Sequence, residues 1–288
     1  MRIAIYGSRR QQDALNSVAR FLRELAENGD SVVMHGKLYD HLMDEIPDAL
    51  DAVDTVCDNG DFTADLAVSL GGDGTFLRTA LWVADKRIPI IGVNTGHLGY
   101  LTALTIEQLT QLPELIASDR LRIESRTMLE VVAPALPIAV GRFALNEIAI
   151  LKEESASMIQ ASVSLGGMPM ADYRADGLII STPTGSTAYN LSVGGPIVQP
   201  TLDVSVISPI AAHSLSMRPL VFDARENVEI IPRSRARHIR IALDGRSTTL
   251  DVNTPVHIRL APFKVMVMQL AGHTFADALR SKLHWGEN

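Results

Sequence analysis

Near-continuous runs of hydrophobic residues alternate with segments of helical period over the first 120 residues. Strands are predicted at four of these runs, residues 2–7, 31–34, 65–70 and 88–93. Hydrophobic positions three and four residues apart predict helices between them, at residues 15–26, 38–46 and 76–84 and from Thr105 onward. Strands that are apolar on both faces and alternate with helices are typical of a parallel sheet. The pattern therefore predicts an α/β domain with a doubly wound parallel sheet over residues 1–120.

From Leu121 onward the hydrophobic period changes to two. Gly166-Gly167 stands where a hairpin turn is expected, and alternating positions recur in residues 143–150, 159–165, 239–243 and 256–260. This pattern favours a β-rich, sandwich-like second domain over residues 121–268. Residues 275–283 have a helical pattern again. We expect residues 269–288 to return to the first domain, because a lone helix has no place in a β-layered one.

Composition narrows the class of protein. The chain has 288 residues, enough for two domains, and 47% of them are hydrophobic, as in an ordinary globular protein. The single cysteine, Cys57, excludes a disulfide framework and favours a reducing, cytoplasmic setting. The net charge of −7 argues against nucleic acid or an anionic membrane as partner, and no apolar run has the length of a membrane span. Local arginines would have to hold an anionic substrate.

The first stretch suited to chemistry follows the predicted strand at 65–70. Gly71-Gly72-Asp73-Gly74-Thr75 leads into a helix, and such glycine turns bind phosphate through backbone N–H groups and the helix dipole. A carboxylate repels phosphate, so Asp73 would accept a proton from a hydroxyl nucleophile or hold a metal ion. A tight turn capped by Asp and Thr explains the same residues. The motif alone does not decide between the two.

A second stretch, residues 173–196, collects glycines and small hydroxylated residues around Tyr189. It suits a flat polar ligand lying along the backbone, and a Ser/Thr-rich loop is the plainer interpretation. Upstream, Asn146 and Glu147 interrupt a hydrophobic strand, and strand alternation sends one of them towards the core or a cleft. A carboxylate there could accept two hydrogen bonds from a ribose diol. The alternative is that Asn146 and Glu147 lie exposed at a strand edge and have no function.

Known nucleotide fingerprints are incomplete. The chain has no Gly-x-x-x-x-Gly-Lys loop, and Leu77 stands where a Gly-x-Gly-x-x-Gly motif needs its third glycine. Arg78 and Arg174 are the candidate charge partners for phosphate, although surface arginines are usually only solvated. A P-loop kinase and a Rossmann dehydrogenase are therefore disfavoured.

Taken in order, the motifs resemble the bacterial NAD kinase family. They are residues 71–75, Asn146-Glu147, Asp176-Gly177 and Thr182-Pro183-Thr184-Gly185-Ser186-Thr187-Ala188-Tyr189. With residues 94–101 and 213–220, the resemblance covers nearly the whole chain. The glycine motif is shared with 6-phosphofructokinases and lipid kinases, whereas the run from Thr182 to Tyr189 with Asn-Glu upstream is specific.

The resemblance implies transfer of the γ-phosphoryl group of ATP to the 2′-hydroxyl of the adenosine ribose of NAD. Asp73 would take the hydroxyl proton, and Gly74, with Arg78 as a helper, would line the phosphates. Asn146 and Glu147 would hold the adenylate side. The other cofactor-binding residues that the resemblance implies are Arg174, Asp176, Thr187, Ala188, Tyr189, Asn190, Ser192, Ala211 and Arg246.

The resemblance implies more about five of these positions. Asp176 and Ala188 would lie towards the nicotinamide end, and Ala211 falls where a neighbouring subunit completes the site in the family. Relatives with Arg at the place of Arg174 tend to prefer NAD to NADH. Arg246 stands where many relatives carry Gln, so the chain departs from the family's pattern at this contact with the dinucleotide.

The resemblance also implies the cofactors and partners. ATP would be the phosphoryl donor, with Mg²⁺ or another divalent metal, and the protein would be a homo-oligomer, a dimer or tetramer. No compact carboxylate cluster in the sequence identifies ligands for the metal. Two other functions remain open at this point, a lipid kinase of the shared superfamily and a non-catalytic dinucleotide sensor. The polar run from Thr182 to Tyr189 disfavours the first, and Asp73 disfavours the second.

Overall fold

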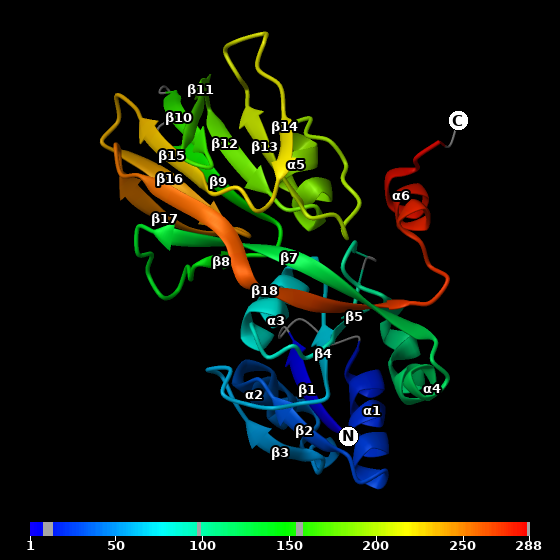
Figure 1. The fold of residues 1–288 in the computed structure, drawn as a ribbon. Coiled ribbons are helices and arrows are strands. Elements are labelled where there is room, and N and C mark those ends of the chain that lie inside the picture. The colour runs from blue at the N-terminus through cyan, green and yellow to red at the C-terminus, as the bar shows by residue number, and fades with distance from the viewer. Residues whose placement is uncertain (8–13, 97–98, 154–157, 287–288) are drawn as a thin grey trace. The chain divides into compact units, whose positions relative to one another are not determined.

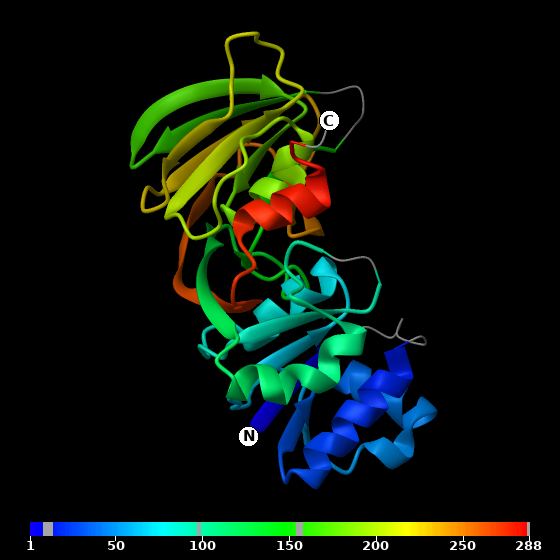
Figure 2. The same cartoon turned by 90° about the vertical axis from the view of Figure 1, so that its right-hand side faces the viewer.

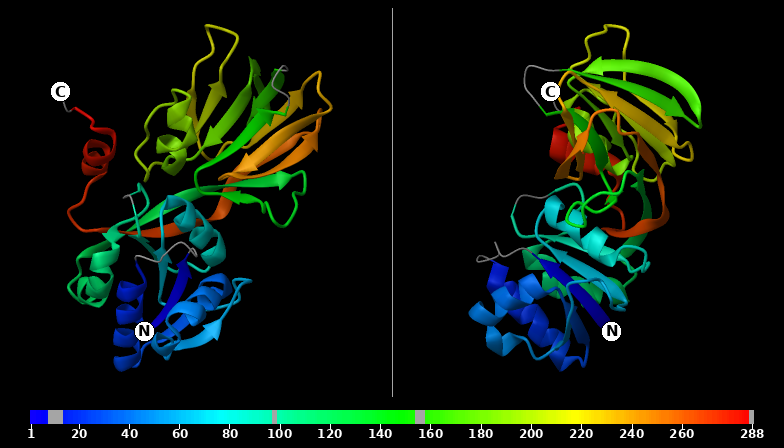
Figure 3. Two further views of the ribbon diagram at one scale, coloured as in Figure 1. Left: turned by 180° about the vertical axis from the view of Figure 1, so that it is seen from behind. Right: turned by 90° about the vertical axis from the view of Figure 1, so that its left-hand side faces the viewer.

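The structure is a computed structural model that describes residues 1–7, 14–96, 99–153 and 158–286 (Figure 1). The chain divides into unit 1, Met1–Ser125 with Val265–Asn288, and unit 2, Arg126–Lys264. These limits differ by a few residues from 1–120, 121–268 and 269–288. Both boundaries fall within long strands, β7 (Leu121–Ala133) and β18 (Val256–Leu270), which pair with each other and lie side by side in Figure 3. In the described residues, no helix is long and apolar enough to cross a membrane.

Unit 1 is built on a parallel sheet of order β18-β5-β4-β1-β2-β3, with β6 beside β5. Its own strands are β1 (Arg2–Gly7), β2 (Ser31–Met34), β3 (Val53–Val56), β4 (Leu66–Leu70), β5 (Ile90–Asn94) and β6 (Leu104–Thr105). This confirms the predicted parallel α/β class. The sequence missed β3, because this four-residue strand at the sheet edge is exposed at every second position and lacks a buried run.

Helices cover both faces of this sheet. On one face, Ile5 of β1 shares a core with Phe21 and Leu22 of α1. On the other face, the Tyr6 ring lies 5.8 Å from that of Trp82 on α3. The helices of unit 1 are α1 (Leu15–Glu27), α2 (Gly36–Glu45), η2 (Pro47–Ala49), α3 (Asp73–Val83), η3 (Ile106–Gln111), α4 (Leu112–Ala117) and α6 (Phe275–Leu283). The helix predicted from Thr105 is thus a 3-10 segment followed by one short α-helix.

Unit 2 is a two-layer antiparallel structure (Figure 2). One layer has the order β11-β10-β15-β18, and the other has the order β14-β13-β12-β9-β16-β17. Ile159 and Ile230 of the first layer share a core with Ile150, Ile180 and Ile241 of the second, so the predicted β-rich class is confirmed. The remaining elements are β8 (Phe143–Ala144), β9 (Glu147–Lys152), β10 (Ile159–Leu165), β11 (Met168–Ala175), β12 (Gly177–Ser181), η4 (Thr184–Thr187), α5 (Tyr189–Ser192), β13 (Val204–Ile210), β14 (Leu220–Asp223), β15 (Val228–Arg233), β16 (His238–Leu243) and β17 (Arg246–Asp251).

Candidate active site

In unit 1 the glycine stretch joins the fully buried strand β4 to α3, and the helix begins at Asp73. The sequence had predicted a turn through Thr75 and a helix from Phe76, so the prediction of the helix start was wrong. The N–H groups of Thr75 and Phe76 both donate to the carbonyl of Gly72, which closes the first turn early. Asp73 therefore lies in the first turn of α3, where the helix dipole favours a negative charge.

The Asp73 carboxylate is oriented by the segment that follows β5. The backbone N–H of Tyr100 donates to Oδ2 at 2.8 Å, and that of Leu101 donates to Oδ1 at 3.0 Å. A Cβ atom at position 99 would overlap the carboxylate, so only glycine permits this approach. The two stretches that the sequence placed at strand ends, 71–75 and 94–101, therefore meet at Asp73. Residues 97 and 98 of the second stretch lie outside the described residues.

Arg78 lies further along α3 and is exposed. Its guanidinium hydrogen-bonds the hydroxyl of Tyr6, at the end of β1. Burial raises the pKa of that hydroxyl, and the Arg78 charge opposes the rise. Arg78 is thus held on the same edge of the sheet as Asp73, with Gly74 between them in the sequence.

In unit 2, Glu147 begins strand β9, and Leu145 and Asn146 form the bend before it. The prediction that Asn146 lies inside the strand was wrong, because a distant side chain holds the bend. The Asp244 carboxylate, in the β16–β17 turn, accepts the backbone N–H groups of Leu145, Asn146 and Glu147 at 2.7, 2.8 and 3.1 Å. No local signal in the sequence singled out Asp244.

The run from Thr182 to Tyr189 packs on this bend. The N–H of Thr182 donates to the carbonyl of Asn146 at 2.9 Å. Gly185 approaches the Asn146 backbone so closely that a Cβ would overlap its carbonyl. The backbone N–H of Tyr189 donates to the Glu147 carboxylate. The structure thus brings together two motifs that the sequence placed 35 residues and more apart.

Glu147 is 8% exposed, and its Oε2 has no hydrogen-bond partner within the described ranges. Burial, together with the nearby Asp244 carboxylate, raises the pKa of Glu147 to about 8. Burial also raises the pKa of Asp244, but three N–H bonds oppose that rise, so of the two carboxyl groups Glu147 is the one that keeps its proton at neutral pH. An exposed strand edge is therefore excluded for Glu147, and a buried carboxyl group with an unused oxygen faces the Thr182–Tyr189 run.

Replacing Glu147 by Gln tests this electrostatic picture. The folded-state pKa of about 8 exceeds the ordinary value of 4.5, so the proton on Glu147 stabilises the fold fully below pH 4.5, and this contribution is lost as the pH rises towards 8. We expect E147Q to gain on the order of 3 kcal/mol relative to the parent between those pH values. Denaturant unfolding from pH 5 to 8.5 measures the difference. The exposed Glu226→Gln serves as control and should show no such trend, and a parallel trend in both variants would contradict the assignment.

Other predicted residues of unit 2 fall near the Thr182–Tyr189 run. Thr187 and Ala188 are half-buried, and Tyr189 and Ser192 are exposed. Asn190 differs, because it is fully buried and its amide nitrogen donates to the carbonyls of Ser186 and Pro196. Its Oδ1 accepts from Ser208 at 2.6 Å, so its side chain supports the loop from inside.

Arg246 is turned towards the backbone. Its guanidinium donates to the carbonyls of Val140 and Phe143, the latter at 2.6 Å. Burial lowers the pKa of Arg246, and the nearby Asp244 opposes the decrease. This arginine therefore anchors the segment before Asn146.

The predicted site residues Arg174, Asp176 and Ala211 form a second group, at the end of β9 and β12 that lies away from Glu147. Register pairs Ser181 with Glu147 and Gly177 with Leu151, so Asp176 and Glu147 are separated by the length of β12. That length corresponds to roughly 17 Å of extended chain. The Asp176 carboxylate pairs with Lys152 Nζ at 2.9 Å, a partner that the sequence did not indicate. Arg174 is exposed on β11, and Ala211 follows β13 with a positive φ of 47°.

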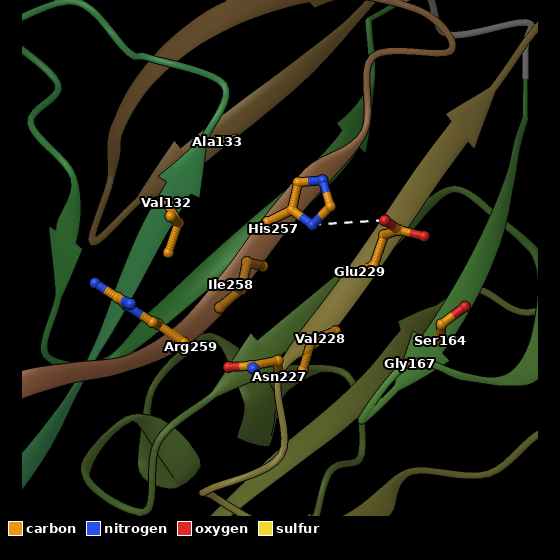
Figure 4. A pocket seen from close by; sticks show the side chains of 10 residues that line it. All are labelled: Val132, Ala133, Ser164, Gly167, Asn227, Val228, Glu229, His257, Ile258 and Arg259. Carbon is orange, nitrogen blue, oxygen red and sulfur yellow. Dashed lines mark ion pairs between the residues drawn. The ribbon is translucent and has the colours of Figure 1, made fainter.

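A pocket of about 490 Å³ in unit 2 belongs to neither group (Figure 4). In it His257 and Glu229 lie 3.5 Å apart, and they alternate along β18 and β15 with the core residues Ile258 and Val228. Both therefore point away from the core, on the layer opposite to Glu147. None of the predicted site residues lines this pocket, whose lining is Val132, Ala133, Ser164, Gly167, Asn227, Val228, Glu229, His257, Ile258 and Arg259.

Comparison with known proteins assigns the family. Residues 3–121 match the ATP-NAD kinase N-terminal domain, and residues 145–270 match the ATP-NAD kinase C-terminal domain. The chain belongs to the NAD kinase family. Its activity is the phosphorylation of NAD by ATP to give NADP and ADP, and neither a lipid kinase nor a non-catalytic sensor is supported.

Individual NAD kinases agree with this assignment over nearly full length. The chain is 37% identical to the NAD kinase of Bacteroides fragilis, covering 99% of this chain and 98% of that one. It is 38% identical to the NAD kinase of Porphyromonas gingivalis, with the same coverage. Among solved structures, an NAD kinase from Archaeoglobus fulgidus in complex with ATP has a TM-score of 0.71 at 25% identity and 94% coverage of both chains. A yeast NADH kinase complexed with NADH has a TM-score of 0.88 at 21% identity, covering 100% of this chain and 89% of that one, and supports the fold alone.

Proposed function

We propose that Asp73 is the group in this NAD kinase that accepts the proton of the ribose 2′-hydroxyl as the oxygen attacks the γ-phosphorus of ATP. The observation that carries the proposal is the fixed carboxylate in the first turn of α3, oriented by the N–H groups of Tyr100 and Leu101. Phosphoryl transfer depends mainly on positioning and electrostatic stabilisation, and a proton acceptor with a fixed direction meets the first need. The free N–H groups of the same turn, including that of Gly74, are suited to phosphate, and Arg78 adds a cation.

The dinucleotide is proposed to lie along the Thr182–Tyr189 run. The unused Oε2 of Glu147 supports this, because a ribose diol would supply the hydrogen bonds that this buried atom lacks. Asn146, Thr187, Ala188, Tyr189 and Ser192 would complete the contacts. Asn190 and Arg246 would act by supporting the loop and the bend from within.

Within unit 2, the residues around Asp176 lie far from Glu147, and this distance is relevant to the oligomeric state of the protein. Arg174, Asp176 and Ala211 are separated from Glu147 by the length of β12, roughly 17 Å. We infer that this group completes the site of another copy in a homo-oligomer, as the resemblance suggested for Ala211. Sedimentation velocity tests the inference, and a protein that is monomeric at assay concentration would contradict it.

The divalent metal is proposed to enter with the substrate. Within the described residues, no three His, Cys, Asp or Glu side chains converge into a metal site. Mg²⁺ commonly binds through nucleotide phosphates and waters with few protein ligands. The lack of a cluster of donor side chains in the described residues fits this mode of binding. When bound, the ion would neutralise charge on the transferred phosphate. A cytoplasmic location, predicted from the single cysteine, stays a prediction.

A turnover assay tests the proposed function directly. The protein is incubated with Mg-ATP and NAD, or with Mg-ATP and diacylglycerol, and the product is identified by its phosphate position. We expect phosphate on the 2′-oxygen of the adenosine ribose and no lipid product. Phosphate at another position of NAD would contradict the proposed geometry.

Arg174 is proposed to favour NAD over NADH. Lys152 is the ion-pair partner of Asp176, so the Arg174 side chain would act on the loop after β13 and not on Asp176. The backbone of residue 174 joins that loop, because its carbonyl accepts the N–H of His213 at 2.9 Å, and this bond is kept when Arg174 is replaced by Gly. We expect at least about tenfold higher kcat/KM for NAD than for NADH, and a gap of only about threefold in Arg174→Gly. Arg233→Gly is the matched control, because Arg174 and Arg233 both pair with Gln160 from the flanking strands. An equal change of the NAD to NADH ratio in both variants would show that Arg174 has no specific role in the selectivity.

A further inference from the structure

Helix α6 carries a lysine to the neighbourhood of Asp73. The helix belongs to unit 1 and begins with a capping box between Thr274 and Asp277. In its last turn, Lys282 is half-buried, and its Nζ lies 4.8 Å from the centroid of the Tyr100 ring. Arg280 of the same turn is exposed and pairs with Asp277 at 2.9 Å. Only one of the two cations of this turn therefore faces the interior of the unit.

Tyr100 connects Lys282 to the reacting carboxylate. The ring of Tyr100 receives the ammonium group, and its backbone N–H donates to Asp73 Oδ2 at 2.8 Å. Burial lowers the pKa of Lys282, and the Asp73 charge opposes the decrease. Burial also raises the pKa of the Tyr100 hydroxyl, which has no hydrogen-bond partner in the described part of the chain. Desolvating a cation costs free energy, and α6 buries no residue that would offset it.

A cation close to Asp73 would lower the electrostatic cost of binding an anionic substrate there. Asp73 is an anion beside the turn proposed to hold the phosphates of ATP, and like charges at close range repel. Arg78 is directed towards Tyr6 at the end of β1, whereas Lys282 lies on the residue that orients Asp73.

We propose that Lys282 is a positioning residue for phosphoryl transfer, whose ammonium group holds Tyr100 against Asp73 and offsets the repulsion between Asp73 and the phosphates. The inference rests on the proposed role of Asp73. It assigns the C-terminal helix a part in the reaction, in addition to its place in the fold.

The test compares three variants by kcat, KM and thermal unfolding. Lys282→Met keeps the length of the side chain and removes the charge, and we expect kcat to decrease roughly tenfold to a hundredfold with little change in melting temperature. Lys282→Arg keeps the charge and the contact with the ring, and it should retain kcat within about threefold. Arg280→Met removes a cation from the same turn and should remain within about twofold of the parent.

The pH profile provides a readout that a purely structural role would not affect. The groups facing Lys282 are Asp73 from α3 and Tyr100, while Arg280 and Asp277 on its own helix pair with each other. We expect kcat of the parent to fall at alkaline pH as Lys282 loses its proton, and Lys282→Arg to remove that decrease, because a guanidinium keeps its charge. Tyr100→Phe keeps the ring and should leave the decrease in place, which separates the lysine from the phenol.

Several outcomes would overturn the proposal. Equal kcat values for Lys282→Met and Arg280→Met would exclude a role for the lysine in the reaction. Equal losses of kcat in Lys282→Met and Lys282→Arg, accompanied by lower melting temperatures, would show that Lys282 only stabilises the fold. An inactive parent protein would overturn the proposed function together with this inference, whereas an active parent with an unaffected Lys282→Met overturns this inference alone.

Discussion

Replacing Asp73 by Asn is expected to lower kcat by roughly a thousandfold while NAD still binds, because general-base catalysis typically contributes 10² to 10⁴. The amide has nearly the same shape as the carboxylate and cannot take the hydroxyl proton. It also presents an NH₂ group to one of the two N–H donors of Tyr100 and Leu101, so one of those hydrogen bonds is lost. Steady-state kinetics gives the loss of rate, and titration calorimetry with NAD gives the affinity.

Asp85→Asn is the matched control for this experiment. Asp85 is exposed just beyond the other end of α3, so the variant makes the same chemical change in the same unit. We expect it to retain the kcat of the parent. A loss of NAD affinity as large as the loss of rate in Asp73→Asn would show that Asp73 binds substrate and does not act as the proton acceptor.

Replacing Asp244 by Ala is expected to have the largest effect on stability, a loss of roughly 3–5 kcal/mol in the free energy of unfolding. Three backbone N–H groups would lose a common charged acceptor, which is itself partly shielded from solvent. The bend at Leu145 and Asn146 would lose the side chain that holds it, so Glu147 should shift as well. We therefore also expect a higher KM for NAD under conditions where the variant is folded.

Asp251→Ala is the matched control, since Asp251 lies at the opposite end of β17 with a 71% exposed side chain and a 3.3 Å contact with His238. Such a surface pair contributes little, and the expected loss is below about 0.5 kcal/mol. Denaturant unfolding of both variants measures the difference. Similar unfolding midpoints for Asp244→Ala and Asp251→Ala would contradict the role given to the Asp244 carboxylate.

The hydrophobic pattern was sufficient to predict the two classes of structure in this chain. A strand buried on both faces, such as β4, leaves a continuous apolar run, and the β10–β11 hairpin leaves alternation interrupted by Gly166-Gly167. Both signals are local, because burial of a face is repeated every few residues. Strand β3 was not predicted for the same reason, because an edge strand whose alternate residues are exposed has no buried hydrophobic run.

The order of the motifs was also sufficient to indicate the reaction, through their resemblance to NAD kinases. Asp73, Glu147 and the Thr182–Tyr189 run could be named as site residues because each stands in a short, recognisable stretch. Their roles stay predictions. Their surroundings could not be predicted, since the partner of each side chain is distant in the sequence.

Tertiary structure decided those partners. Strand pairing brings Asp244 to the N–H groups of residues 145–147, almost 100 positions away. The return of the C-terminal segment to unit 1 brings Lys282 to Tyr100. Lys152 reaches Asp176 because β9 and β12 pair in register. A buried carboxylate or ammonium group is stable only where the fold supplies a charge or hydrogen-bond partner, and periodicity contains no information about which distant residue that is. The sequence by itself therefore determined the layers and the chemical groups of the site, while the long-range pairing of strands and backbone determined how those groups are oriented and charged.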